Sequence, residues 1–479
     1  MLKATGIGIG AGATALATPT ALAAPTDAAG APLVHPGLLH TRADLDRMAA
    51  KVKAGARPYT AGFAELTANR HAQSGWRANP QAVVYRGSGT PENYATLYND
   101  IHAAYQNALR HHVSGEEAYA DTAVAILNAW SGKLTRLEGS ADRFLAAGLY
   151  GYQFANAAEL VRDHGDFDLE RARELLLNVF HPLSDSFLSH HNNAVVTNYW
   201  PNWDLAALAC LLATGIFCDE RALVERAVEY FKHGDGMGSV EHAIPVVHED
   251  GLGEWVEAGR DQGHALLGVG LMGTVCEMAW NQGIDLYGYD DSRFLKGAQY
   301  VARWSLGGDV PYTANTRKKG AIGGWSGTET ASEVAGVDPG MTRPIWAMIA
   351  NHYTRRRGLP ASYLTRAAAK AAPEGGGGDY GPNSGGFDQL GFGTLAFTRD
   401  RAEEPTGGPS PTPGASSGGS RGAGGVRPQA SASPAAGEDL AATGSGDAAG
   451  WAAAAGIGAV AGGLLLLRRR DRVRRGVAE

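Results

Sequence analysis

Cysteine is scarce in this chain. Only three occur among 479 residues, Cys210, Cys218 and Cys276, and each lies in an apolar segment. No pair has the spacing of a zinc site, no histidine and aspartate cluster has ligand spacing, and no nucleophile signature surrounds any cysteine. We therefore expect buried free thiols rather than a Cys210–Cys218 disulfide, and neither a metal ion nor another cofactor.

Charge is also sparse, and positive charge does not dominate. Charged residues make up 19% of the chain, and the formal net charge is −7. The last twelve residues alone carry six arginines against two acids, so the remainder is more acidic than the total. Overall charge gives no support for nucleic-acid binding, and an anionic ligand would need a local basic patch.

The N-terminal residues 1–23 have the pattern of an export signal. They contain Lys3, an apolar stretch of glycine, alanine and threonine, and then Ala21-Leu22-Ala23. Two small residues separated by one other residue mark the site at which signal peptidase cleaves. We expect a signal peptide that ends at Ala23; the alternative is a disordered N-terminus.

The C-terminal residues 440–479 carry a stronger signal. Leu440-Ala441-Ala442-Thr443-Gly444 precedes an apolar run over about 448–467 and an arginine cluster at 468–470. A run of ~20 apolar residues can span a bilayer, and the arginines stay on the cytoplasmic side. The pentapeptide resembles the Leu-x-x-Thr-Gly sorting signals of Gram-positive bacteria. That resemblance implies cleavage by a sortase between Thr443 and Gly444 and transfer to peptidoglycan; the alternative is a plain membrane anchor.

Residues 400–439 are rich in proline, glycine, serine and alanine and have almost no large apolar side chain. Such a segment cannot bury enough surface to fold, so we expect a solvated stalk. Together these features predict an extracellular protein anchored to the cell wall, made as a precursor that is bound to the membrane by residues 448–467.

Residues 32–399 have the pattern of one helical domain. Thr41 is a capping residue, and Leu45, Met48 and Val52 follow at helical spacing. Further helices are expected at 93–113, 116–134, 141–164, 167–190, 203–215, 219–232, 260–282, 293–305 and 340–357. Strand patterns are few and lie near the C-terminal end of the domain, at 391–397. These features favour a mainly all-α fold, an α/α toroid of helical hairpins, whose concave end could hold a long polymer.

Aromatic and amide side chains gather just before one predicted helix. Those that could contact a ligand are Asn198, Tyr199, Trp200 and Asn202. Flat rings suit sugar rings, and amides can hydrogen-bond to hydroxyl or carboxylate groups. In the alternative, structural interpretation, Trp200 and Trp203 are hydrophobic anchors and Asp204 caps the helix. We favour the structural interpretation for Trp203 and a functional role for Asn198 and Tyr199.

A second group of polar residues precedes an apolar segment at 266–279. Glu257, Arg260 and His264 recur at i, i+3 and i+7, so we expect them on one face of a helix. An arginine and a titratable histidine at the mouth of a buried helix suit an anionic ligand. In the alternative interpretation, Glu257 and Arg260 form a structural pair and His264 is satisfied in the core.

These two groups are similar to the pattern of the alginate lyase superfamily of polysaccharide lyases, over roughly residues 32–399. The spacing of Glu254 and Arg260, the apolar helix that follows, and its end at 281–286 carry the resemblance. It implies that Arg260 binds a uronate carboxylate. The upstream Asn/His-x-Tyr-Trp element of that family resembles Asn198-Tyr199-Trp200.

Two departures distinguish this chain from the family pattern. The family's catalytic tyrosine, seven residues after the arginine, falls on Leu267, and the upstream histidine has no clear equivalent because Asn198 stands near its place. The sequence therefore resembles a divergent branch, and alginate, glucuronan or another uronate polymer are all candidate substrates.

The resemblance implies β-elimination, in which an enolate-like intermediate forms beside the uronate carboxylate. Arg260, with Asn198 or Gln262, would neutralise that carboxylate. His264 is the best-placed base, and Tyr199 is the preferred acid. The remaining candidates for substrate contact are Trp200, Asn202 and Glu257, together with Tyr152 and Tyr312, which are reserve acids.

Two other classes of function fit the sequence. An inverting glycoside hydrolase on the same toroid needs two carboxylates about 6.5–9.5 Å apart, for which Glu254, Glu257 and Asp261 are candidates. A non-catalytic glycan-binding protein would also explain the stalk and the wall anchor. The loss of the family tyrosine at Leu267 keeps that possibility open.

Overall fold

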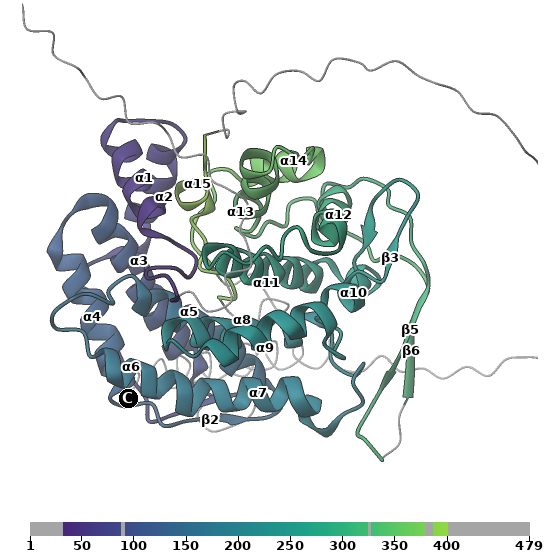
Figure 1. Ribbon diagram of the computed structural model, residues 1–479, viewed down its shortest axis with the longest axis horizontal. Coiled ribbons are helices and arrows are strands. Elements are labelled where there is room, and N and C mark those ends of the chain that lie inside the picture. Colours follow the sequence, from purple (N-terminus) through teal and green to yellow (C-terminus); the bar gives the residue numbers. More distant parts are fainter. Residues whose placement is uncertain (1–31, 88–91, 324–326, 379–386, 401–479) are drawn as a thin grey trace, which may run out of the picture. The chain divides into compact units, whose positions relative to one another are not determined.

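The computed structural model describes residues 32–87, 92–323, 327–378 and 387–400. Most of these residues are helical (Figure 1). The longer helices are α1 (Arg42–Lys53), α2 (Tyr59–Ala68), α3 (Tyr94–Ser114), α4 (Glu117–Ser131), α5 (Asp142–Glu159), α7 (His181–His190), α8 (Pro201–Phe217), α9 (Arg221–His233), α11 (Gln262–Asn281), α12 (Tyr289–Ser305) and α14 (Ser362–Ala371). Shorter ones are α6 (Leu169–Leu175), α10 (Val240–Ala243), α13 (Trp346–Asn351) and α15 (Gly393–Ala396). The mainly helical toroid expected from the sequence is confirmed.

The inner layer consists of α3, α5, α8, α11 and α13, each packed on the next. Outer helices complete the hairpins, with α4 on α3, α7 on α5, α9 on α8, α12 on α11 and α14 on α13. The core between the layers is one continuous cluster of buried apolar side chains. Close approach of α5 and α8 requires glycine, because a Cβ atom on Gly148 would come within 2.6 Å of the Ala206 backbone.

Neighbouring inner helices run in the same direction. Along each pair of neighbouring helices, the numbers of the contacting residues increase together, as they do only when two helices are parallel. The pairs that show this are His102 with Gln153 and His112 with Leu160, Gly148 with Ala206 and Gly151 with Cys210, and Gly270 with Ile345 and Gly273 with Ile349. Asn156 and Met278, both near the C-terminal ends of α5 and α11, are also in contact. The N-terminal ends of the inner helices therefore open at one mouth of the toroid.

The local helix signals are largely confirmed. Thr41 forms a capping box with Asp44 at the start of α1. The segment expected at 167–190 is helical but contains a π-helical turn at Leu176–Phe180. Helices α2 and α14 are additional to those predicted.

The strand expected at 391–397 is wrong. Residues Gly393–Ala396 form helix α15, which begins after Phe392 with its φ angle at +58°. Phe392 and Leu395, three residues apart, are both fully buried, and Leu395 packs against Gly62 of α2. A helical turn places two side chains at this spacing on the same, buried face, whereas a strand would place them on opposite faces.

The few short strands were expected near the C-terminal end of the domain. They occur throughout it. Parallel β1 (Val83–Arg86) and β2 (Arg136–Gly139) lie early in the chain. Antiparallel pairs are β3 (Val246–Val247) with β4 (Gly253–Glu254) and β5 (Asn315–Lys319) with β6 (Gly327–Ala331).

The three cysteines are buried free thiols, as expected. Burial raises the pKa of Cys210 to about 11 and that of Cys218 to about 12, which keeps both protonated at neutral pH. Among the described residues, no helix is long and apolar enough to cross a membrane. The span predicted at 448–467, the signal peptide, the sorting signal and all but Asp400 of the stalk lie outside the described residues.

The domain boundary can be tested by truncation. Arg399 is largely buried, with Nη1 2.6 Å from Asp44 Oδ1, whereas Asp400 makes only a surface pair with Lys51. A chain of residues 32–400 should therefore keep the thermal midpoint of the longer protein, measured by calorimetry. In that chain Arg399→Met should lose about 3–5 kcal/mol of unfolding free energy, because Asp44 stays buried with one cation fewer. A large loss on truncation alone would contradict the boundary.

Glu374 should make stability depend on pH. Its carboxyl group is buried, one oxygen accepts the N–H groups of Trp346 and Ala347, and the other has no partner among the described residues. Burial raises its pKa from 4.5 to about 7, against the effect of those N–H groups. Folding therefore favours the protonated form. The resulting stability is complete below the unfolded pKa and falls as the pH rises toward 7.

We expect Glu374→Gln, which keeps the acceptor oxygen, to remove roughly 1–3 kcal/mol of this pH dependence between pH 5 and pH 8. Urea unfolding of both proteins at the two pH values measures it. Exposed Glu249→Gln is the matched control. Equal pH dependence in wild type and Glu374→Gln would refute this role.

Candidate active site

Two segments far apart in the chain meet around the side chain of Trp200. One is the link between α7 and α8, residues 191–200, and the other is the turn η4 (Val256–Gly259) with the start of α11. Trp200 packs against Met237 and Val256, and the Arg260 guanidinium lies 5.5 Å from the centre of its ring. Both segments precede the N-terminal ends of inner helices, so the site lies at the mouth of the toroid.

Arg260 contacts both of the other polar residues of its group, Glu257 and His264. Its Nη1 donates to Glu257 Oε1 at 2.9 Å, and its Nη2 lies 3.2 Å from His264 Nε2. The prediction that these residues share one helical face is wrong, because Glu257 lies in η4 and α11 begins only at Gln262. Asp261 is extended and caps α11, which bends the chain between Glu257 and His264. The side chains nevertheless converge, with a quarter of Arg260 exposed.

His264 is oriented by Asp261. Its Nδ1 lies 2.7 Å from Asp261 Oδ2, and its Nε2 faces Arg260. Arginine only donates hydrogen bonds, so Nε2 is the acceptor and Nδ1 carries the proton. Although burial acts to raise the pKa of Asp261, the hydrogen bonds from His264 and the charge of Arg260 lower it. Asp261 thereby fixes the imidazole ring so that Nε2 faces Arg260.

Glu257 has a different environment. Its carboxyl is fully buried, and one oxygen has no hydrogen-bond partner among the described residues. Burial raises the pKa of Glu257, and Arg260 and His264 only partly offset that rise. Glu257 therefore anchors Arg260 from below and presents no surface to a ligand.

Trp200 is enclosed by two cations. Arg317 on β5 lies 4.1 Å from the ring centre, closer than Arg260. Arg317 also donates to the carbonyls of Thr197 and Asn198 and pairs with Glu329. The sequence analysis missed Arg317, because one arginine in a short strand more than a hundred residues away carries no local signal.

The link before Trp200 begins with a strained turn. His191, Asn192 and Asn193 have φ angles of +45°, +52° and +57°. Residues other than glycine in this region cost about 1–2 kcal/mol each and persist only where the surroundings hold them. Asn192 Nδ2 donates to the Tyr199 hydroxyl at 2.9 Å. The turn thus orients Tyr199, which still has its own proton to donate.

Trp203 and Asp204, at the start of α8, both have structural contacts. Trp203 packs on Tyr199 and Phe187, which fits the structural interpretation. Asp204 does not cap α8. It is buried and accepts hydrogen bonds from the Tyr230 hydroxyl at 2.9 Å and from Gly238 N at 3.1 Å, and His191 Nε2 lies 3.1 Å away. Sequence reasoning missed His191 and Tyr230, whose cluster depends on a contact between α8 and α9.

Several predicted residues are committed to the scaffold. Gln262 exchanges two hydrogen bonds with the backbone of Asp338, and Asn202 is buried. Tyr152 is fully buried, with its hydroxyl donating to Asp388 O at 2.6 Å. None of these three reaches the Arg260 side chain.

Asn198 contacts the chain just after β5, and Tyr312 lies against the residue that precedes Arg260. Asn198 Oδ1 accepts from Gly320 N, which leaves its NH₂ group for another acceptor. The Tyr312 hydroxyl lies directly over Gly259, where a Cβ atom would have no room, and donates to Ala331 O at 3.2 Å. Beneath the first turn of α11, the missed Arg343 donates to Gly263 O and pairs with buried Asp388.

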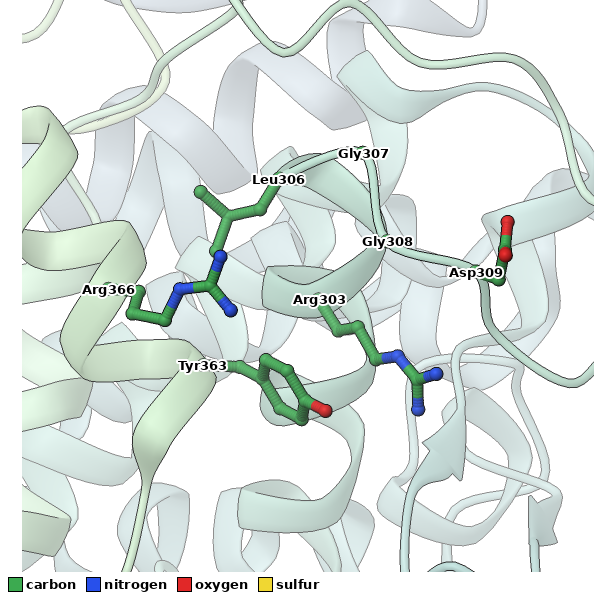
Figure 2. Close-up of a pocket in the computed structure, with 7 residues that line it drawn as sticks. All are labelled: Arg303, Leu306, Gly307, Gly308, Asp309, Tyr363 and Arg366. Carbon is green, nitrogen blue, oxygen red and sulfur yellow. The ribbon is translucent and has the colours of Figure 1, made fainter.

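A separate cavity of about 340 Å³ lies between the end of α12 and the start of α14 (Figure 2). Arg303, Tyr363 and Arg366 contribute its side chains, and none of the residues around Arg260 lines it. It is distinct from the candidate site.

Residues 63–310, just over half of the chain, match the family model described as Alginate lyase. The chain belongs to the alginate lyase family. It is therefore a polysaccharide lyase, and the hydrolase and non-catalytic interpretations fall away. The hydrolase also lacks its carboxylates, since Glu254 is buried between His248 and Thr313 N and Glu257 is buried under Arg260.

Solved lyase structures share the helical character at low identity. Alginate lyase A1-III from Sphingomonas species A1 is 14% identical, with 77% of this chain and 98% of that chain covered and a TM-score of 0.48. A variant of A1-III complexed with a tetrasaccharide has the same identity and TM-score, with 79% and 99% covered. An alginate lyase from Bacteroides ovatus is 13% identical, with 57% and 83% covered and a TM-score of 0.40. A search of curated proteins gives no match.

Proposed function

We propose that this lyase cleaves a uronate-containing polysaccharide, such as alginate or glucuronan, by β-elimination at Arg260 and His264. The observation that carries the proposal is the contact of Arg260 Nη2 with His264 Nε2 at 3.2 Å, with Asp261 on the far side of the imidazole. A cation for a carboxylate thus lies beside an imidazole nitrogen that can take up a proton. In a uronate the carboxylate and the proton to be removed are on the same carbon, C5.

Proton abstraction from C5 is difficult because negative charge builds up next to an existing carboxylate. A donor aimed at the carboxylate oxygens stabilises that charge as it forms. Arg260 supplies the planar guanidinium, and the NH₂ group of Asn198, which binds no other residue that the structure describes, can add a second donor. Gln262 cannot assist in the observed arrangement, since both ends of its amide bind Asp338.

The bond changes balance without an additional reactant. His264 Nε2 takes the C5 proton, the electron pair forms the C4–C5 double bond, and the bond from C4 to the bridging oxygen breaks. Tyr199 gives its proton to that oxygen. Binding of the carboxylate would draw Arg260 away from Nε2 and release the lone pair of His264. Trp200 is buried against Arg260 and Arg317, so it supports these side chains rather than stacking on a sugar ring.

The fold supports an anionic substrate. The inner helices bring their N-terminal ends, which carry partial positive charge, to the mouth where Arg260 lies. The net charge of the chain is negative, so this local positive field is the means by which a polyanion would be attracted.

Substitution of Arg260 tests the assignment. Arg260→Ala should lower turnover about 10²–10³-fold, because one stabilising donor is lost as the intermediate forms. Arg260→Lys should recover little, since an ammonium group does not reproduce the planar fork. Turnover is followed by the ultraviolet absorbance of the 4,5-unsaturated uronate product.

Arg303→Ala is the matched control. Arg303 has similar exposure and one acidic partner, Asp250, but lies outside the site. Its loss should leave turnover unchanged. If Arg260 is only structural, Arg260→Ala will lower the melting temperature while turnover stays near normal, and the assignment then fails.

We also propose that the enzyme is displayed on the cell wall. The support is sequence order: a signal peptide at 1–23, the domain at 32–399, a stalk at 400–439, and Leu440–Gly444 before an apolar run and an arginine cluster. A stalk in extended polyproline form gives up to ~3.1 Å per residue of reach toward a polymer outside the cell.

Thr443→Ala tests the display. A sortase forms its acyl bond to this threonine, so the variant should move from the peptidoglycan fraction to the membrane and medium fractions, as followed by immunoblot. Thr412→Ala in the stalk is the control and should stay with the wall. Wall attachment of Thr443→Ala would rule out this sorting signal.

A further inference from the structure

The strained turn at 191–193 is fastened to a distant hairpin. Ile322 N donates to Asn193 O and Val195 N donates to Gly320 O, each at 2.9 Å. Thr197 Oγ1 donates to Lys318 O at 2.7 Å, which continues the contact along β5. The link to Trp200 thus lies along β5 as an added strand would.

Arg317 is the one β5 side chain that is buried in this contact. Its guanidinium binds two carbonyls of the link, pairs with Glu329 directly across the hairpin, and lies against Trp200. Because its guanidinium binds the link and Glu329 and lies against Trp200, Arg317 presents little surface to substrate. Burial lowers the pKa of Arg317, Glu329 opposes this, and Arg260 adds to the lowering, so the two guanidinium groups interact across Trp200.

We propose that Arg317 is a positioning residue of the lyase reaction. By fixing Trp200 and the link that leads to it, it sets the place of Arg260 against the same ring and of Tyr199, which directly precedes Trp200. This rests on the proposed function of Arg260. Because a misplacement of about 1 Å can cost up to 10²-fold in rate, such a residue affects turnover without touching substrate.

The test compares Arg317→Met with Lys318→Met. Both remove one positive charge from β5, but Lys318 is exposed on the opposite face of the strand. For Arg317→Met we expect kcat to fall about 10–100-fold with KM nearly unchanged. Amide hydrogen exchange should quicken over 191–200 and stay the same in α11. Lys318→Met should match wild type in all three measurements.

Arg317→Lys separates charge from geometry. An ammonium group keeps the charge but cannot bridge two carbonyls and Glu329 together, so it should restore little of kcat. Full recovery in Arg317→Lys would overturn the positioning role, as would normal kcat in Arg317→Met. If Arg317→Met does not fold, Glu329→Gln is the alternative variant, because it removes the ion pair of Arg317 with Glu329. Glu329→Gln should lower kcat less than Arg317→Met is expected to, and amide hydrogen exchange at 191–200 should still be faster than in wild type. Wild-type behaviour of Glu329→Gln would also overturn the proposal.

The two proposals fail in different ways. A wild-type protein that releases no unsaturated product contradicts the proposed function and, with it, this role for Arg317. An active wild type together with an unaffected Arg317→Met contradicts the positioning role alone.

Discussion

Parallel packing of the inner helices places the N-terminal ends of α8, α11 and α13 at one mouth, and this constraint decides where charge can lie. One of these ends is capped by a carboxylate, Asp261 on α11, and the first N–H groups of α13 bind Glu374, whose pKa is raised by burial. The start of α8 has no side-chain cap, follows Trp200 and carries buried Asp204 in its first turn. An incoming carboxylate would meet Arg260 beside Trp200, where the start of α8 also lies. The fold and the chemistry of the site follow from the same helix direction.

Around that point, acidic and basic side chains form a connected series. Asp261 orients His264, His264 faces Arg260, Trp200 lies against both Arg260 and Arg317, and Glu329 pairs with Arg317. Glu257 pairs with Arg260 and also acts on the charge of Arg317, so the aromatic ring and this acid lie near both arginines. A ring lowers the repulsion between flanking cations through its negative faces, yet it carries no net charge. The exposed quarter of Arg260 is the part of this cluster that a uronate carboxylate can meet.

How much the sequence could predict depended on distance along the chain. Thr41, the apolar run after His264 and the group from Glu257 to His264 are local patterns, and each was visible. Even there the bend at Asp261 was hidden, because an aspartate in a helical pattern reads equally well as a cap or as an exposed side chain. Arg317 lies more than a hundred residues from Trp200, so only the folded chain pairs them. The left-handed turn at His191 was equally invisible, since β5 holds it in place and no glycine marks it.

Because Leu267 replaces the family tyrosine, another residue has to give a proton to the leaving oxygen. Leu267 is buried in the core and can neither donate nor accept a proton. Tyr312 lies against Gly259, next to Arg260, and Tyr199 directly precedes Trp200 in the chain, but their hydroxyl groups differ. Tyr312 already donates its proton to Ala331 O, and burial and Glu254 raise its pKa, so it would have to break a bond to act as a weaker acid. Tyr199 accepts a hydrogen bond from Asn192, which leaves its proton available and stabilises the phenolate that remains after transfer. The strained turn that supplies Asn192 thereby contributes to the acid as well as to the wall behind Arg260.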